Sequence, residues 1–383
     1  MSTDTHKDKI LPSSSTVSVT HPSISVTPLP ASQIDATFST TTNLSTTVLG
    51  ASIVSFSDEY FASAANLLTP TPAIHKPGVY VHSGAWYDGW ETRRHNQKPF
   101  DWVVVKLGCV GVIEGVEVDT AHFSGNEAPE AGLDGCSLPK GNEDVGKEEF
   151  AGWSEILPKQ ACGPSQRQAW KVEGEGVRGR QYTHLRLKMY PDGGIARLRI
   201  YGHAVPPPLA SLVDSEGHAP IEELSSALKG GVAISCSDQH FGVRSNILLP
   251  GRGKDMGDGW ETARSKTKGH VDWVICRLGL KGKSVDKVVV DTKDFRGNFP
   301  RAVKVEGWLE AKDEAALQPE ADDEGWVELV RGEKPCQADT EHVYDEQDLS
   351  TRIIPDGNVL THVKMTIIPD GGVKRLRIFG RRA

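Results

Sequence analysis

The stretch Asp88-Gly89-Trp90-Glu91-Thr92-Arg93-Arg94 sets the organisation of this 383-residue chain, because it returns almost unchanged as Asp258-Gly259-Trp260-Glu261-Thr262-Ala263-Arg264. Each copy leads into the same apolar pattern, DWVVVKLG over residues 101–108 and DWVICRLG over residues 272–279. Self-similarity of this kind predicts that one structural unit occurs twice.

The flanking motifs repeat in the same order. SFSDEYF (55–61) matches SCSDQHF (235–241), FSGN (123–126) matches FRGN (295–298), and THLRLKMYPDGG (183–194) matches THVKMTIIPDGG (361–372). The last pair alternates apolar and polar residues and then turns at Pro-Asp-Gly-Gly, which predicts a β-hairpin closing each repeat. No long stretch carries a helical apolar stripe. The predicted fold is therefore all-β, with two tandem antiparallel β-sandwiches of about 150 residues each that arose by internal duplication.

Composition suggests four segments. Residues 1–45 are rich in Ser, Thr and Pro and are expected to form a low-complexity tail, mobile at least through Pro30. Residues 46–204 and 223–383 form the two repeats, and the Pro-rich segment 205–222 is the predicted linker. The charged stretches 132–149 and 311–323 are expected to be loops.

Bulk properties exclude several classes of protein. The net charge of −8 argues against nucleic-acid binding. No apolar run reaches the roughly 20 residues that cross a membrane, and the N-terminus has no secretory signal. The six cysteines form no CxxC pair, as expected for reduced thiols in a cytoplasmic protein.

The motifs DGWET, VDT-x-x-F-x-GN and PDGG-x-x-RLRI, each present twice in the same order, resemble those of the allantoicase family over residues 50–383. The resemblance implies two jelly-roll domains of the galactose-binding-like type. It also implies that the small-molecule substrate is allantoate and that the products are (S)-ureidoglycolate and urea. This reaction is a step of allantoin degradation, a branch of purine catabolism. Finally, the resemblance implies that the protein is a homo-oligomer. The alternative is a non-catalytic tandem jelly-roll protein that only binds a ligand, since fold does not dictate function.

Hydrolysis of allantoate requires a cation for its carboxylate, an acid and a base, and hydrogen-bond partners for its ureido groups. Arginine binds carboxylates bidentately, so Arg94 and Arg264 are the first candidates for the cation, although either could instead brace its loop through an internal ion pair. Arg93 faces Ala263 in the alignment of the repeats, which predicts that the two sites are not equivalent.

The remaining candidates follow from the same chemistry. The candidate catalytic residues are Asp88, Glu91, His184, Asp258, Glu261 and His362, and the candidate substrate-binding residues are Trp90, Arg93, Arg94, Asn126, Trp260, Arg264 and Asn298. Each has a structural alternative: the acids in turns, the histidines and tryptophans in the core, and the Gly-Asn pairs in turns. No motif predicts a metal site, so no cofactor is derivable, and a divalent ion held by scattered side chains remains an open alternative.

Overall fold

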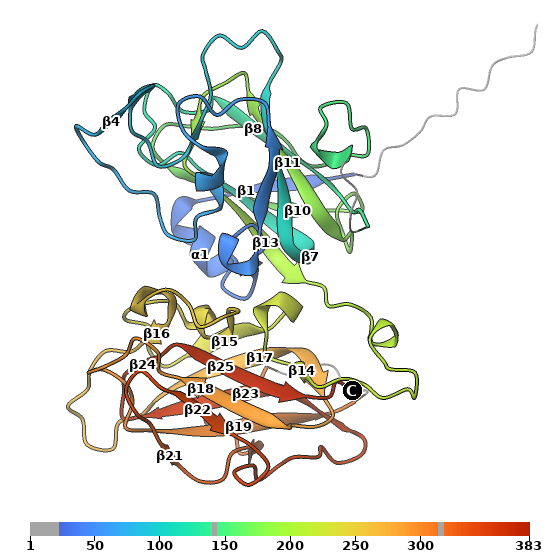
Figure 1. Ribbon diagram of the computed structural model, residues 1–383, viewed down its shortest axis with the longest axis vertical. Coiled ribbons are helices and arrows are strands. Elements are labelled where there is room, and N and C mark those ends of the chain that lie inside the picture. Colours follow the sequence, from blue (N-terminus) through green and yellow to red (C-terminus); the bar gives the residue numbers. More distant parts are fainter. Residues whose placement is uncertain (1–22, 140–143, 313–317) are drawn as a thin grey trace, which may run out of the picture.

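The computed structural model describes residues 23–139, 144–312 and 318–383. Two β-sandwiches, one for each repeat, stack along the long axis of the molecule, and the chain crosses from the first to the second through a single connection (Figure 1). The predicted all-β architecture with two repeats is confirmed.

The first repeat is a sandwich whose two sheets share one long strand. The first half of β7 pairs with β3 and β11, and its second half pairs with β10 and β13. Its elements are β1 (Ser25–Leu29), η1 (Ala31–Gln33), α1 (Ile34–Thr37), β2 (Thr42–Asn43), η2 (Thr47–Leu49), β3 (Ser52–Phe56), η3 (Ala64–Leu68), β4 (Tyr80–Val81), β5 (Gly84–Ala85), β6 (Trp90–Glu91), β7 (Asp101–Asp119), β8 (Glu130–Cys136), η4 (Asp144–Gly146), β9 (Ser154–Ala161), β10 (Arg167–Glu173), β11 (Tyr182–Tyr190), β12 (Gly194–Ile195) and β13 (Arg197–Ala204).

In the second repeat the same path is divided into two strands, β17 and β18, so that the sheets are separate. One sheet has the order β14-β25-β18-β22, and the other has β15-β17-β23-β19-β20 with β21 beside β19. The elements are η5 (Leu209–Ser211), β14 (Glu222–Glu223), η6 (Ala227–Lys229), β15 (Val232–Cys236), η7 (Arg244–Leu248), η8 (Met256–Asp258), β16 (Trp260–Glu261), β17 (Asp272–Gly282), β18 (Lys287–Asp291), β19 (Ala302–Ala311), β20 (Trp326–Glu328), β21 (Lys334–Pro335), β22 (Glu341–Tyr344), β23 (Asn358–Ile368), β24 (Gly372–Val373) and β25 (Arg375–Gly380).

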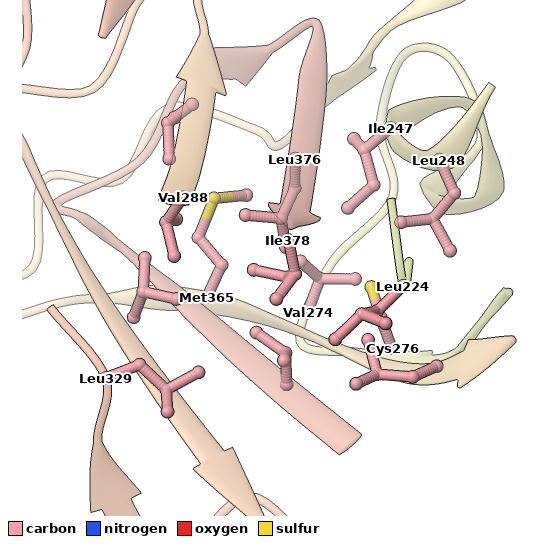
Figure 2. Close-up of a cluster of buried hydrophobic side chains, with 14 of the residues drawn as sticks. Leu224, Ile247, Leu248, Val274, Cys276, Val288, Leu329, Met365, Leu376 and Ile378 are labelled. Atoms are coloured by element: carbon pink, nitrogen blue, oxygen red, sulfur yellow. The ribbon is translucent and has the colours of Figure 1, made fainter. Parts of the chain in front are cut away.

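The hydrophobic core of each repeat lies between its two sheets. In the second repeat, Val274 and Met365 from one sheet meet Val288 and Ile378 from the other, with Leu248 closing one end (Figure 2). The alternation seen in the sequence places these side chains inward, because successive residues of a strand point to opposite faces. Burying them is the main stabilising contribution to each sandwich.

The N-terminal segment differs from its prediction. Residues 25–29 form β1, which pairs antiparallel with β10, so the expectation of a mobile tail through Pro30 is wrong for this strand. Ile34 and Phe38 are buried against the first repeat, and the ring of Phe38 stacks on Tyr201 with centroids 4.2 Å apart. The tail predicted for residues 1–22 lies outside the described residues.

The β-hairpin predicted at each Pro-Asp-Gly-Gly turn is wrong. In the first repeat β11 pairs with β7 and β8 while β13 pairs with β2 and β7, and in the second repeat β23 and β25 belong to different sheets.

Two further expectations need adjustment. Residues 132–136 of the predicted loop 132–149 belong to β8, where they pair with β11. Glu222, the last residue of the predicted linker, is the first residue of β14. All six cysteines are free thiols. Within the described residues, no helix has the length and apolar character needed to cross a membrane.

Candidate functional site

Three of the repeated motifs meet at one end of each sandwich. In the first repeat, β6 pairs with β12, so that Glu91 lies opposite Gly194 of the Pro-Asp-Gly-Gly turn. The backbone N–H of Ala128, just after the FSGN motif, donates to the carbonyl of Gly194 at 2.9 Å. A Cβ on Gly194 would lie 2.1 Å from the ring of Phe123, so only glycine allows this approach. The second repeat pairs Glu261 with Gly372 in the same way.

Glu91 is the carboxyl group at the centre of this junction. Its side chain accepts a hydrogen bond at Oε1 from Asn126 Nδ2, 3.0 Å away, and the residue is only 6% exposed. Burial raises the pKa of Glu91, although the hydrogen bond from Asn126 and the charge of Arg94 act in the opposite direction. A buried carboxyl beside a guanidinium has the components of an acid catalyst next to an anion site.

Arg94 is held beside Glu91 by a turn carboxylate. Its Nη1 lies 3.3 Å from Oδ1 of Asp192, and the side chain is 34% exposed. We call Glu91, Arg94, Asn126 and Asp192 the Glu91 cluster. Sequence reasoning proposed the first three residues and missed Asp192, although its repeated Pro-Asp-Gly-Gly motif was the available signal.

The equivalent residues of the second repeat, Glu261, Arg264, Asn298 and Asp370, form the Glu261 cluster. Asn298 Nδ2 donates to Glu261 Oε1 at 2.5 Å, which repeats the contact of the first cluster. Arg264, however, donates through Nη2 to the backbone carbonyl of Gly297 at 2.6 Å. The two clusters therefore share the acid and the amide but differ in how the arginine is held.

Both asparagines are already engaged. Asn126 Oδ1 accepts from the backbone N–H of Ser124 at 3.0 Å while its Nδ2 reaches Glu91. The predicted role of Asn126 was to hold a ureido group, but its hydrogen bonds indicate that it orients Glu91 instead. Asn298 makes the matching contact with Glu261.

The two aspartates of the central motif are structural. Asp88 Oδ2 accepts from Nη2 of the buried Arg197 at 2.7 Å and from the backbone N–H of Ile74 at 2.9 Å. Asp258 forms an ion pair with the fully buried Lys374. Burial alone would raise the pKa of Asp258, but hydrogen bonds from Lys254 and Lys374 bring it below its ordinary value. The prediction that Asp88 or Asp258 acts as acid or base is therefore corrected, because both serve as partners of buried cations.

The tryptophans of the same motif belong to the core. Trp90 and Trp260 are 0% exposed. Each indole Nε1 donates to a backbone carbonyl, that of Asp58 at 2.8 Å and that of Asp238 at 2.9 Å. Their predicted contact with substrate is corrected, since neither ring reaches the surface.

The histidines lie elsewhere on the sheets. His184 is near the start of β11 and His362 is near the middle of β23, and the Pro-Asp-Gly-Gly turn follows the ends of these strands. Pro191 follows His184 by seven positions along an extended strand, which corresponds to roughly 20 Å. Burial lowers the pKa of both imidazoles, that of His362 to about 4, with Lys106 and Arg277 adding to the effect. Both side chains are buried and lie seven positions before the turn, so the structure does not bring them to this site, and their predicted role as proton shuttles there is corrected.

Arg93 makes its side-chain contacts outside the Glu91 cluster. Its side chain is 65% exposed and lies 3.4 Å from Asp58. The guanidinium stacks over the ring of Tyr60 at 4.6 Å. Arg93 is therefore a rim residue of the first repeat, and Ala263 provides no counterpart in the second.

Two cavities lie away from the Glu91 cluster. A cavity of about 590 Å³ separates the repeats, but its charged groups are bonded internally: Arg167 pairs with Glu117 and Asp35, and Arg199 donates to backbone carbonyls. We assign it to the contact between repeats. A more open pocket of about 450 Å³ near the Glu261 cluster contains two carboxylates and one arginine, an unfavourable balance for an anionic substrate; its lining residues are Asp255, Met256, Gly257, Asp294 and Arg296.

Among the described residues, no group of three or more His, Cys, Asp and Glu side chains is arranged to hold a metal ion.

Fold and clusters together define a duplicated jelly-roll protein with one acid and one arginine at the same end of each sandwich, the acid being buried in the first repeat and half-buried in the second. Residues 42–205 and 222–383 each match the model of the allantoicase repeat. The chain is 53% identical to the allantoicase of Neurospora crassa, over 94% of this chain and 97% of that protein.

Solved structures agree with this match. The crystal structure of the Saccharomyces cerevisiae allantoicase superposes with a TM-score of 0.77 at 42% identity, covering 93% of this chain and 100% of that one. A second allantoicase structure gives a TM-score of 0.74 at 44% identity, covering 91% and 96%. The chain belongs to the allantoicase family. It is accordingly a hydrolase, and the alternative of a non-catalytic tandem binding protein is not favoured.

Proposed function

We propose that this protein hydrolyses allantoate to (S)-ureidoglycolate and urea, and that the Glu91 cluster of the first repeat carries the reaction. The observation that supports this site best is the buried carboxyl of Glu91, held through Oε1 by Asn126 with the partly exposed guanidinium of Arg94 beside it. Membership of the allantoicase family supports allantoate as the substrate. The geometry of the Glu91 cluster supports placing the reaction in the first repeat.

Arg94 is suited to the carboxylate of allantoate. Among the described residues its side chain makes one hydrogen bond, through Nη1 to Asp192, so most of its donors remain for a ligand. A guanidinium presents paired N–H groups that match a carboxylate in geometry and charge. In the second repeat, Arg264 instead directs a donor to a backbone carbonyl.

Glu91 is suited to transfer the proton in both halves of the reaction. In the first half, the protonated carboxyl gives its proton to the nitrogen of one ureido group, and the C–N bond breaks to release urea. The nitrogen of the second ureido group supplies the electron pair that forms the C=N bond of an acyliminium intermediate. In the second half, water adds to that carbon and returns a proton to the Glu91 carboxylate. One carboxyl thus acts first as acid and then as base.

The assay for this proposal is the release of urea from allantoate by the purified full-length chain. We expect urea and ureidoglycolate in equal amounts, between pH 6 and 9. The reaction is run with and without added Mn²⁺, so that dependence on a metal is measured at the same time. No urea under any of these conditions would contradict the proposed activity.

We also infer that the protein is a cytoplasmic homo-oligomer without nucleic-acid or membrane partners. The six free thiols support the location, the net charge of −8 argues against nucleic-acid partners, and family membership supports the oligomer. Light scattering should give a mass that is a multiple of the 41.6 kDa chain, and a mass equal to the chain would contradict the oligomer. Cell fractionation tests the location, and recovery with membranes or outside the cell would contradict it.

A further inference from the structure

Asp192 has one side-chain oxygen fixed by the backbone and the other turned to Arg94. Its Oδ2 accepts from the backbone N–H of Asn96 at 3.1 Å, and its Oδ1 lies 3.3 Å from Arg94 Nη1. The chain can return to Asp192 within two residues of Arg94 because His95 adopts the left-handed conformation, with φ of 64°. The buried carboxylate therefore has a set orientation before Arg94 binds to it.

The turn that carries Asp192 is itself tied to the strand of Glu91. The backbone N–H of Thr92 donates to the carbonyl of Gly193 at 3.0 Å, and the Thr92 hydroxyl accepts from the N–H of Gly193 at 3.3 Å. The N–H of Asp101 donates to the carbonyl of Pro191 at 3.1 Å. Asp192 and Glu91 thus belong to one rigid frame, and any cation fixed by Asp192 is also fixed relative to Glu91.

The second repeat contains the same turn without this ion pair. Asp370 Oδ2 accepts from the backbone N–H of Ser265 at 2.8 Å, which matches the contact of Asp192 with Asn96 in kind. Arg264 does not take the other oxygen and donates to the carbonyl of Gly297. The backbone contact is therefore shared by both repeats, and the contact with arginine occurs only in the first among the described residues.

We propose that Asp192 is a positioning residue for substrate binding: it holds the guanidinium of Arg94 in the orientation that receives the carboxylate of allantoate. This inference rests on the proposed function of the Glu91 cluster. A partly exposed ion pair adds little to the stability of a fold, so its main consequence is orientation. Freed from Asp192, the flexible arginine side chain would have to be ordered by each substrate molecule, which weakens binding.

The test compares Asp192→Asn with its matched control, Asp370→Asn. The amide keeps an oxygen for the backbone N–H in both variants, but at position 192 it removes the charge that faces Arg94. We expect Asp192→Asn to raise KM for allantoate by about tenfold with kcat nearly unchanged, as for a group that acts on substrate binding. Asp370→Asn should leave both constants near those of the natural chain. Equal KM values for the two variants would overturn the inference.

A second pair of variants separates this inference from the proposed function. Arg94→Lys keeps the charge but loses the planar fork, and KM should rise. If KM stays unchanged in Arg94→Lys, the anchor assigned to Arg94 is wrong. If KM rises in Arg94→Lys and not in Asp192→Asn, the anchor stands and the role of Asp192 is wrong.

The double variant completes the test. If Asp192 acts through Arg94, adding Asp192→Asn to Arg94→Lys should change KM by less than it does alone. Additive effects would overturn the inference. Should Asp192→Asn fail to fold, Asp192→Glu takes its place, because it keeps the charge but moves it by one methylene, and an unchanged KM for this variant would equally contradict the positioning role.

Discussion

Replacing Glu91 by glutamine is expected to lower kcat on allantoate by about 10²–10⁴-fold, the range typical of a lost general acid–base group. Glutamine keeps the shape of the side chain and an oxygen for the hydrogen bond from Asn126, so the fold should be retained. What it loses is the proton that the leaving urea nitrogen must receive.

Glu261→Gln is the matched control for this experiment. It removes the same group from the same motif with the same asparagine contact, but in the cluster whose arginine is bound to a backbone carbonyl. Its kcat should stay close to that of the natural chain. Equal losses in the two variants would indicate two working sites or a shared one, and a loss in Glu261→Gln alone would move the reaction to the second repeat.

Replacing Lys374 by methionine is expected to lower the free energy of unfolding by about 3–5 kcal/mol, as for other buried ion pairs that lose one partner. The Lys374 side chain is fully buried, and its Nζ pairs with Asp258 and lies 3.1 Å from Asp294. Methionine fills a similar volume but removes the buried cation that the two carboxylates share, and leaves them only the more distant Arg375 at 3.7 Å and Lys293 at 3.9 Å. The first repeat has Ala196 at the equivalent position, so the effect belongs to the second repeat.

Unfolding in guanidinium chloride measures this effect, with Lys98→Met as the control. Lys98 pairs with Glu148 at 2.7 Å, but both side chains are about half exposed, and such pairs contribute about 0–1 kcal/mol. Similar losses of stability in the two variants would contradict the structural role assigned to the Lys374 ion pair.

Local sequence patterns predicted the strands well because each pattern reflects a physical preference that acts within a few residues. The alternation before Pro191 and Pro369 predicts the strands β11 and β23 without reference to the rest of the chain. The hairpins predicted at these turns are wrong, because strand pairing is set by the whole sandwich: β11 pairs with β7 and β8, β13 pairs with β2 and β7, and β23 and β25 lie in different sheets. The strand β1 escaped prediction because Pro28 and its Ser- and Thr-rich neighbours resemble a disordered segment. Proline is tolerated there because β1 is the edge strand of its sheet.

The site was predicted only in part, because a local motif does not show which distant residues its side chains will hydrogen-bond. Asp88 and Glu91 are three positions apart and looked equally suited to acid–base chemistry. Their roles differ because of their hydrogen-bond partners. Arg197, distant in the sequence, donates to the carboxylate of Asp88, whereas Asn126 donates to that of Glu91. The histidines failed as candidates for a simpler reason: the length of β11 separates His184 from the turn.

The central claim is that allantoate binds at the Glu91 cluster, and a crystal structure of the slow Glu91→Gln variant with allantoate tests it most directly. We predict the ligand in the first repeat, with its carboxylate on the guanidinium of Arg94 and one ureido nitrogen facing position 91. A ligand beside Arg264 in the second repeat, or in the cavity between the repeats, would contradict the claim.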